Sequence, residues 1–176
     1  KKQKLDSVIL NKLALKSKKK INLNNWTEFL SALKNPKDEV RIAVIGKYVE
    51  LQDAYKSISE AIIHAGAYNS CKIDVEWIHS EKIDSSNVKE KLKNLSGILV
   101  APGFGDRGME GKIASIKYVR ENNIPFFGIC LGMQSAVIEY SRNVLKLKNA
   151  DSTEMNTNTK HPVIDLMKSQ KNLNEK

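Results

Sequence analysis

The sequence lacks the features that mark membrane and exported proteins. None of its apolar runs approaches the roughly 20 residues that a helix needs to cross a bilayer. The lysine-rich beginning, Lys1 to Lys4, is followed by an amphipathic stretch and not by the apolar core of a signal peptide. We therefore expect a cytoplasmic protein that does not bind a membrane.

Cysteine is scarce, which argues against a disulfide-stabilised or zinc-binding protein. The chain contains only Cys71 and Cys130, which lie far apart and in no metal-ligand spacing. A disulfide framework or a zinc site is therefore not expected. Each cysteine has to be interpreted from its own surroundings, and no metal site is predicted.

Aromatic residues are also few, 6% of the chain, which bears on the meaning of its positive charge. The formal net charge is +9, but residues 1–20 contribute +7 of it. This lysine-rich segment has no interleaved aromatic side chains that could stack on bases. We interpret it as a solvated helix, and we expect no nucleic-acid partner.

The first 38 residues differ in character from the rest. Residues 5–16 and the stretch from Trp26 to Leu33 have helical spacing, with Asn24 and Asn25 as the expected cap of the second helix. Proline and turn residues in Asn35-Pro36-Lys37-Asp38 end that pattern. We predict a domain boundary here, with a linker at 1–38 and a separate domain at 39–176.

Beyond this boundary, strand patterns alternate with helical ones. Strands are predicted at 40–45, 71–78, 97–101 and 124–129, and helices at 53–66, 87–95, 111–122 and 131–144. In the first helix we expect Asp53 as the cap, Gly66 as the stop, and an apolar face of Ile58, Ala61, Ile62 and Ala65. The alternation predicts an α/β fold, an open and mostly parallel sheet with helices on both faces. Residues 168–176 have no core pattern and are expected to be frayed.

The sharpest motif is a cysteine at a strand–helix junction. Gly128-Ile129-Cys130-Leu131-Gly132-Met133-Gln134 leads from an apolar strand directly into a helix, with glycines two residues before and after the cysteine. This spacing is typical of a nucleophile elbow, whose tight turn needs small neighbours. The helix amino terminus favours the thiolate and offers N–H groups to an oxyanion. We interpret Cys130 as a nucleophile, the alternative being a buried core cysteine, which is our interpretation of Cys71.

A glycine-rich segment, Ala101-Pro102-Gly103-Phe104-Gly105-Asp106-Arg107-Gly108, follows the third predicted strand. Glycines let a loop approach a ligand by its backbone. Ligands of open parallel sheets bind beyond the carboxyl ends of the strands, where the elbow also lies. We expect this loop to face Cys130 as an oxyanion loop, with a simple turn as the alternative.

A cysteine nucleophile needs a base, usually a histidine, and the chain has three. His64 lies near the end of a predicted helix and is interpreted as a surface residue. His79 directly follows the second strand and is placed to face the cleft. His161 lies in a polar connection with no acidic residue beside it. The residues alone do not identify the base.

These motifs resemble those of class I glutamine amidotransferases, and specifically those of CTP synthases. Besides the elbow, three stretches carry the resemblance: Gly46-Lys47-Tyr48 through Asp53-Ala54-Tyr55-Lys56-Ser57, then Gly103 to Gly108 with Glu110-Gly111-Lys112, then Asn149 to Glu154. The resemblance covers about residues 40–167. It implies a flavodoxin-like core at 39–176 as the amidotransferase domain, with residues 1–38 as the end of a synthetase domain and its linker.

The resemblance also implies a reaction. Cys130 would attack the side-chain amide of L-glutamine and form a thioester, and the released ammonia would convert UTP to CTP. The N–H groups of Gly103 and Leu131 would form the oxyanion hole. The residues implied to hold glutamine are Gly103, Leu131, Gly132, Met133, Gln134 and Glu154. No cofactor is implied in this domain, since ATP and Mg belong to the synthetase domain of a full-length homotetramer.

Two features depart from the family pattern. Pro102 stands where the family usually has a second glycine, and proline has no N–H to donate. The family's catalytic histidine and glutamate lie in a later His-Pro-Glu motif, which His161-Pro162-Val163 does not match. The chain as written is therefore expected to lack the residues that complete the triad.

Alternative functions follow from these departures. The elbow and Glu154 favour an enzyme domain, whereas the absent His-Pro-Glu motif favours a catalytically incomplete module that regulates or assembles a synthetase. A different hydrolase with His79 as its base is a third interpretation.

Overall fold

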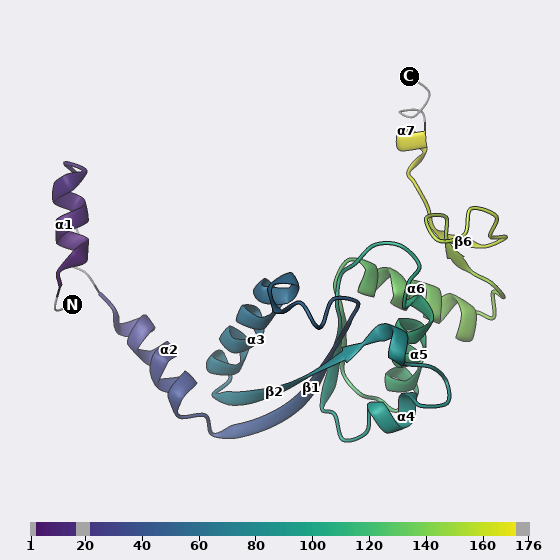
Figure 1. Ribbon diagram of the computed structural model, residues 1–176, viewed down its shortest axis with the longest axis horizontal. Coiled ribbons are helices and arrows are strands. Elements are labelled where there is room, and N and C mark those ends of the chain that lie inside the picture. Colours follow the sequence, from purple (N-terminus) through teal and green to yellow (C-terminus); the bar gives the residue numbers. More distant parts are fainter. Residues whose placement is uncertain (1–2, 17–21, 172–176) are drawn as a thin grey trace.

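The computed structural model describes residues 3–16 and 22–171, and its centre is a four-stranded parallel sheet (Figure 1). The strands are β1 (Asp38–Gly46), β2 (Cys71–His79), β3 (Gly97–Val100) and β4 (Phe126–Gly128). Their order in the sheet is β2-β1-β3-β4, and all three pairings are parallel. The predicted α/β fold with an open parallel sheet is confirmed.

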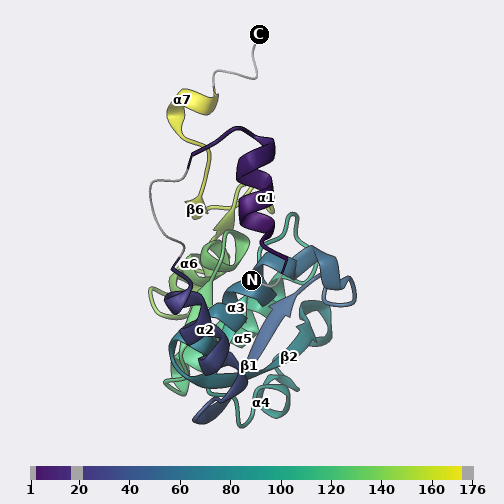
Figure 2. The same cartoon turned by 90° about the vertical axis from the view of Figure 1, so that its left-hand side faces the viewer.

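Helices cover both faces of this sheet (Figures 1 and 2). On one face α3 (Lys56–Tyr68) packs through Ile58 against Val44. The other face is covered by α4 (Val88–Lys91) and α5 (Met109–Glu121), with α6 (Leu131–Asn143) packed beside α5. The apolar run at the end of β1, Ala43 to Ile45, is buried on both faces of the sheet, whereas the edge strand β2 alternates apolar with charged residues.

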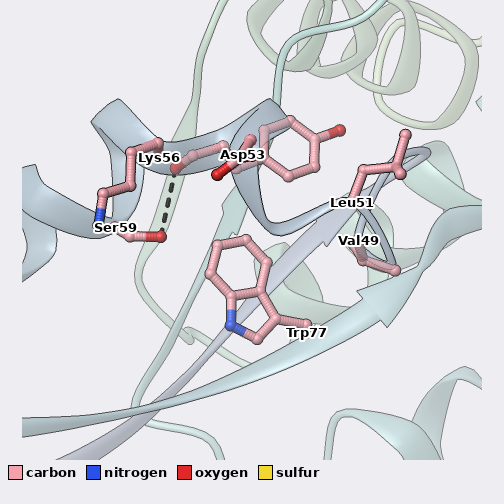
Figure 3. Close-up of a pocket in the computed structure, with 7 residues that line it drawn as sticks. Val49, Leu51, Asp53, Lys56, Ser59 and Trp77 are labelled. Carbon is pink, nitrogen blue, oxygen red and sulfur yellow. Dashed lines mark hydrogen bonds between the residues drawn. The ribbon is translucent and has the colours of Figure 1, made fainter.

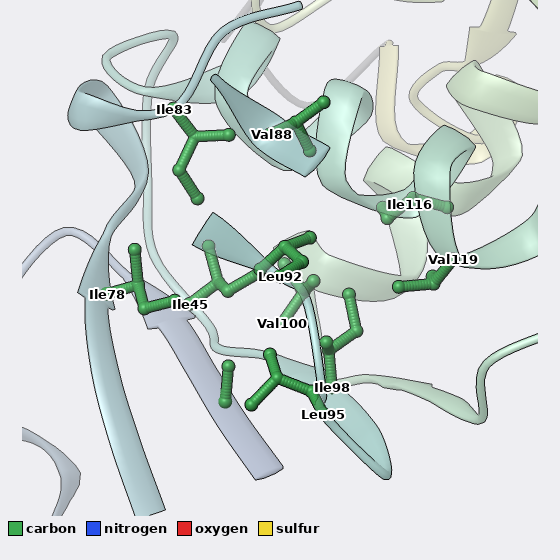
Figure 4. Packing of buried hydrophobic residues seen from close by; sticks show 11 residues of the cluster. Ile45, Ile78, Ile83, Val88, Leu92, Leu95, Ile98, Val100, Ile116 and Val119 are labelled. Atoms are coloured by element: carbon green, nitrogen blue, oxygen red, sulfur yellow. The ribbon is translucent and has the colours of Figure 1, made fainter. Parts of the chain in front are cut away.

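The larger core cluster lies between the sheet and α4 and α5 (Figure 4). Ile45, Ile98 and Val100 project from the strands and meet Leu92 and Ile116. Full burial of one such side chain contributes about 1.5–3 kcal/mol to stability. This cluster therefore fixes the strands whose carboxyl ends hold the two glycine-rich segments.

The remaining elements are peripheral: α1 (Leu5–Lys12), α2 (Asn24–Lys34), the 3-10 turns η1 (Gln52–Tyr55) and η2 (Ser80–Lys82), β5 (Asp151–Ser152), β6 (Pro162–Ile164) and α7 (Lys168–Lys171). No residue of α1 is buried, whereas α2 reaches α3 through the ring of Phe29, 4.9 Å from that of His64. Within the described ranges, no helix is long and apolar enough to span a membrane. The boundary near residue 38 stays a prediction.

Several local predictions are wrong. Gly66 does not stop α3, which continues to Tyr68; a Cβ at Gly66 would lie 2.7 Å from the Cys71 carbonyl oxygen, so close packing on β2 explains this glycine. Ala61 and Ala65 are exposed and not part of the buried face. The N-cap position of α2 is Leu23, which makes no side-chain cap bond, and the side chain of the preceding Asn22 accepts from the Asn24 N–H at 2.8 Å.

Two further predicted segments differ, and some predictions concern residues that the structure does not describe. Residues 168–171 form the short helix α7 where fraying was predicted, and residues 172–176 lie outside the described part of the chain. Lys18 to Lys20 of the basic segment also lie outside it. The helix predicted at 87–95 is reduced to the four residues of α4.

Candidate active site

Cys130 occupies a strained turn between β4 and α6. Its backbone has φ 53° and ψ −111°, a left-handed value that non-glycine residues rarely adopt, and its side chain is exposed. A Cβ at Gly128 would lie 2.6 Å from the Gly132 carbonyl carbon, and one at Gly132 only 2.1 Å from the Val100 carbonyl oxygen. Both glycines are therefore required by this turn, which has the geometry of a nucleophile elbow.

The amino terminus of α6 lies directly at the cysteine. Cys130 is the N-cap residue and Leu131 the first residue of this 13-residue helix. The N–H of Leu131 consequently has no acceptor within the helix, whereas that of Gly132 donates to the Ile129 carbonyl at 2.9 Å. Helix N–H groups and the helix dipole favour negative charge at this point.

The glycine-rich loop faces this helix end. A Cβ at Gly103 would lie 3.6 Å from the Leu131 side chain, an ordinary van der Waals distance. Gly103 and Leu131, the two residues predicted for the oxyanion hole, are thus neighbours at the carboxyl edge of the sheet. The carbonyl of Pro102 lies 3.5 Å from the hydroxyl of Tyr55, which is buried.

Glu154 reaches the same loop from the segment after β5. Its Oε1 accepts from the Gly105 N–H at 3.2 Å, and its own N–H donates to the Ser152 hydroxyl at 3.2 Å. Met133 and Gln134 lie in the first turn of α6, Met133 exposed and Gln134 half-buried. Three separate segments therefore bring the predicted site residues together, and their contacts with glutamine stay predictions.

Two buried lysines below the loop were not predicted as functional. Lys47 donates through Nζ to the carbonyls of Phe104 and Gly105, the latter at 2.8 Å, and Lys112 donates to the Ala101 carbonyl at 3.1 Å. Burial, with the charge of Lys47, lowers the pKa of Lys112 to about 8, and the Cys130 thiolate opposes this shift. Burial and the nearby Arg107 lower the pKa of Lys47 as well.

A sequence signal for these lysines existed. Lys112 falls in the apolar stripe of α5, three residues after Met109 and four before Ile116, so the helical period already places it inside. Lys47 immediately follows the buried strand β1 at its carboxyl end, where ligands of parallel sheets bind.

Within the described residues, none of the three histidines forms a hydrogen bond with Cys130. His79 accepts at Nδ1 from the Glu81 N–H at 3.3 Å, the ring of His64 is tilted against that of Phe29, and the His161 carbonyl accepts from the Asp151 N–H at 3.1 Å. Cys71 begins β2 at the opposite edge of the sheet from the elbow and is half-buried.

A pocket of about 270 Å³ lies between β2 and the start of α3 (Figure 3). Tyr55 and Trp77 stack in it with ring centroids 5.9 Å apart. None of the predicted site residues lines this pocket, since its walls are Val49, Leu51, Asp53, Tyr55, Lys56, Ser59 and Trp77. It is therefore distinct from the surface at Cys130.

Comparisons with known proteins agree with this geometry. The family described as "Glutamine amidotransferase class-I" matches residues 50–175. CTP synthases of Cytophaga hutchinsonii and Methanocaldococcus jannaschii are 62% and 51% identical over 100% and 99% of this chain, which spans about a third of their length (33% of each).

A solved structure, "Trypanosoma brucei CTPS - glutaminase domain with bound acivicin", has a TM-score of 0.70 and 39% identity. The match covers 74% of this chain and 51% of that one. Together with the cysteine elbow and its facing loop, the matched family shows that the chain belongs to the class I glutamine amidotransferases.

Proposed function

We propose that this chain is the glutamine-hydrolysing domain of a CTP synthase, which supplies ammonia for the ATP-dependent amination of UTP to CTP. The observation that carries the proposal is the elbow at Cys130 with the Gly103 loop facing it. The similarity to CTP synthases over the whole chain supports it. UTP, ATP and Mg would bind in a synthetase domain, and the full-length enzyme would be a cytoplasmic homotetramer.

In the proposed reaction the Cys130 thiolate attacks the side-chain carbonyl of L-glutamine. A C–S bond forms, and the oxygen charge is held by the N–H groups of Gly103 and Leu131. Collapse breaks the C–N bond, and the leaving nitrogen takes a proton from a general acid and departs as ammonia. Water then attacks the thioester, releasing glutamate and restoring the thiolate.

The first turn of α6 and Glu154 would bind the rest of the substrate. The carboxylate of Glu154 is placed at the loop and has the charge to receive an α-ammonium group. Gly132, Met133 and Gln134 extend from the elbow along the same helix. Pro102 has no N–H to offer, which leaves Gly103 as the donor on the loop.

One observation favours a second function. No histidine in the described part of the chain contacts Cys130, so the general acid and base of the proposed reaction have no candidate there. The alternative is a catalytically incomplete amidotransferase-like module that regulates or assembles a synthetase.

Labelling with acivicin, the ligand named for the Trypanosoma brucei structure, separates binding from turnover. We expect one adduct in the intact mass of the wild-type protein, retained in Cys71→Ala and lost in Cys130→Ala. Release of glutamate from glutamine, measured on the full-length protein, identifies the enzyme. An adduct without glutamate release supports the incomplete module, and the absence of any adduct would contradict the proposed glutamine-hydrolysing function.

A further inference from the structure

We propose that Lys47 is a positioning residue for glutamine hydrolysis, whose buried ammonium group fixes the direction of the loop peptide that holds Glu154. The inference rests on the proposed function, and it assigns a role to a side chain outside the predicted substrate contacts. It starts from the position of Lys47, directly after β1 and only 4% exposed.

The ammonium of Lys47 holds two consecutive carbonyls of the loop. Nζ donates to the oxygen of Phe104 and to that of Gly105, the latter at 2.8 Å. Hydrogen bonds from an ionised donor are about twice as strong as neutral ones. Burying the ammonium costs free energy, which the lowered pKa of Lys47 reflects, so these two contacts are maintained against a penalty.

The peptide unit between Phe104 and Gly105 links Lys47 to Glu154. No peptide bond in the described chain is cis, so the C=O and N–H of this unit point in opposite directions. Its carbonyl accepts from Lys47, and its N–H donates to Glu154 Oε1 at 3.2 Å. The lysine therefore sets the orientation of the N–H group that holds the carboxylate proposed to bind the substrate.

A related contact is made two peptide units earlier. The backbone N–H of Lys47 donates to the Tyr55 hydroxyl at 3.2 Å, and this hydroxyl lies 3.5 Å from the Pro102 carbonyl. The opposite end of the same peptide unit is the N–H of Gly103, the proposed oxyanion donor. Lys47 thus reaches both peptide units, the Phe104–Gly105 unit by its ammonium group and the Pro102–Gly103 unit by its backbone N–H through Tyr55.

Packing does little to hold the tip of the loop. Phe104 is 81% exposed, and a Cβ at Gly105 would have no described atom within 4 Å. Gly105 also has a left-handed φ of 67°, one of several conformations that glycine adopts without strain, so its backbone alone does not fix the tip. The two hydrogen bonds from Lys47 are therefore expected to decide the conformation of the tip.

Lys112 offers a matched control from the same neighbourhood. It is also buried, but its Nζ contacts the carbonyl of Ala101, at the root of the loop. Ala101 is fully buried and already fixed by its N–H bond to Ile45 at 2.9 Å. Loss of Lys112 should accordingly leave the tip in place.

The test compares two alkylating probes on the full-length protein. A chloroketone analogue of L-glutamine needs the assembled site before the Cys130 thiolate displaces its chloride. Iodoacetamide loses iodide to the same thiolate without needing the loop. We divide the second-order rate constant for the chloroketone by that for iodoacetamide. Changes in thiolate reactivity cancel in this ratio, which therefore reports whether the loop is correctly placed.

We expect Lys47→Met to lower this ratio by about tenfold or more, because misplaced binding groups lose much of their effect. Lys112→Met should leave the ratio within about twofold of wild type, since its contact lies outside the tip. Lys47→Gln keeps a neutral donor and should give an intermediate ratio; it also serves as the test if Lys47→Met fails to fold.

A wild-type ratio in folded Lys47→Met, or in Lys47→Gln when Lys47→Met does not fold, would overturn the proposed role of Lys47. An equal fall in the ratio for Lys112→Met would overturn it as well, because loss of any buried lysine would then suffice. In both cases labelling of wild type by the chloroketone would leave the proposed function standing. Failure of the chloroketone to label wild type would instead remove the proposed function and the role of Lys47 together.

Discussion

Cys130 combines an exposed thiol with a backbone conformation that only its surroundings can maintain. The left-handed turn is stabilised because Gly128 lets β4 approach α6, and Gly132 lets α6 approach β3, to distances that no side chain tolerates. Strain of this kind costs of order 1–3 kcal/mol and persists where packing over-determines it. The two glycines are thus structural conditions for the position of the nucleophile.

Gly132→Ala should destroy this turn. Its Cβ would lie 2.1 Å from the Val100 carbonyl oxygen, so strand and helix must separate. We expect a loss of about 3 kcal/mol or more in the free energy of unfolding, measured by urea denaturation. Gly103→Ala is the control, because its Cβ meets only ordinary contacts and should change stability by less than about 1 kcal/mol. Equal stabilities of the two variants would contradict the steric argument.

Because of Lys112, we expect the free energy of unfolding to increase with pH in the alkaline range. Its pKa is about 8 in the fold against an ordinary value of 10.5, so the unfolded chain binds more protons between these values. Folding must bury a charged ammonium below pH 8, and this penalty disappears as the pH rises towards 10.5. From pH 7 to 10, wild type should gain about 1–3 kcal/mol relative to Lys112→Met. Urea unfolding at each pH measures these free energies of unfolding. The same change with pH in the two proteins would contradict the role given to Lys112.

Among the elements, α6 follows the nucleophile directly and is joined to α5 by an ion pair whose carboxylate is buried and whose guanidinium is partly exposed. Glu139 is 1% exposed by its side chain and accepts from Arg120 at Nη2 (2.8 Å) and Nε (3.0 Å for Oε2). This pair raises the pKa of Arg120. Met109, Ile113, Leu131 and Ile138 pack between the same two helices. The position of α6 is therefore set by one ionic and several apolar contacts.

Arg120→Met should destabilise the protein by about 3 kcal/mol, because it leaves the Glu139 carboxylate buried without its partner. The double variant Arg120→Met/Glu139→Met removes both charges and should recover most of the loss. Chemical denaturation of the single variants and the double variant measures the coupling between them. Additive losses would show that the pair contributes nothing beyond its separate side chains.

At the scale of the whole molecule, the parallel sheet gathers the site and leaves the amino-terminal helix apart. β3 and β4 end at one edge, so the loop and the elbow meet there although they are far apart in the chain. In contrast, Leu5 and Ile9 of α1 are 61% and 47% exposed (Figure 1). The stability of the sheet domain should therefore be independent of α1.

Replacing Leu5 and Ile9 together with serine should change the free energy of unfolding by less than about 0.5 kcal/mol, since neither side chain is buried. Phe29→Ser is the comparison, because this half-buried ring contacts His64 on α3, and it should cost about 1–2 kcal/mol. Thermal or urea unfolding of the 176-residue chain measures both. A large loss of stability in the Leu5 and Ile9 double variant would instead indicate that α1 packs against the sheet domain.

Much of the fold was predictable because it depends on local pattern. Apolar β-branched runs and helical spacing identified all four strands of the sheet and the helices around them, and paired glycines identified the elbow. Local pattern failed where a distant contact decides. Gly66 has the sequence pattern of a helix stop but packs inside α3 against β2.

The sequence by itself determined the alternation of strands and helices and the turn that exposes Cys130, because both follow from residues adjacent in the chain. Only the tertiary structure decided that Lys47, Tyr55 and Glu154 meet the Gly103 loop. Those contacts join residues 47 to 58 positions apart, and their geometry depends on strand order and register. A buried lysine aimed at a loop carbonyl looks, in sequence, like any other lysine, since burial is a property of the packed molecule.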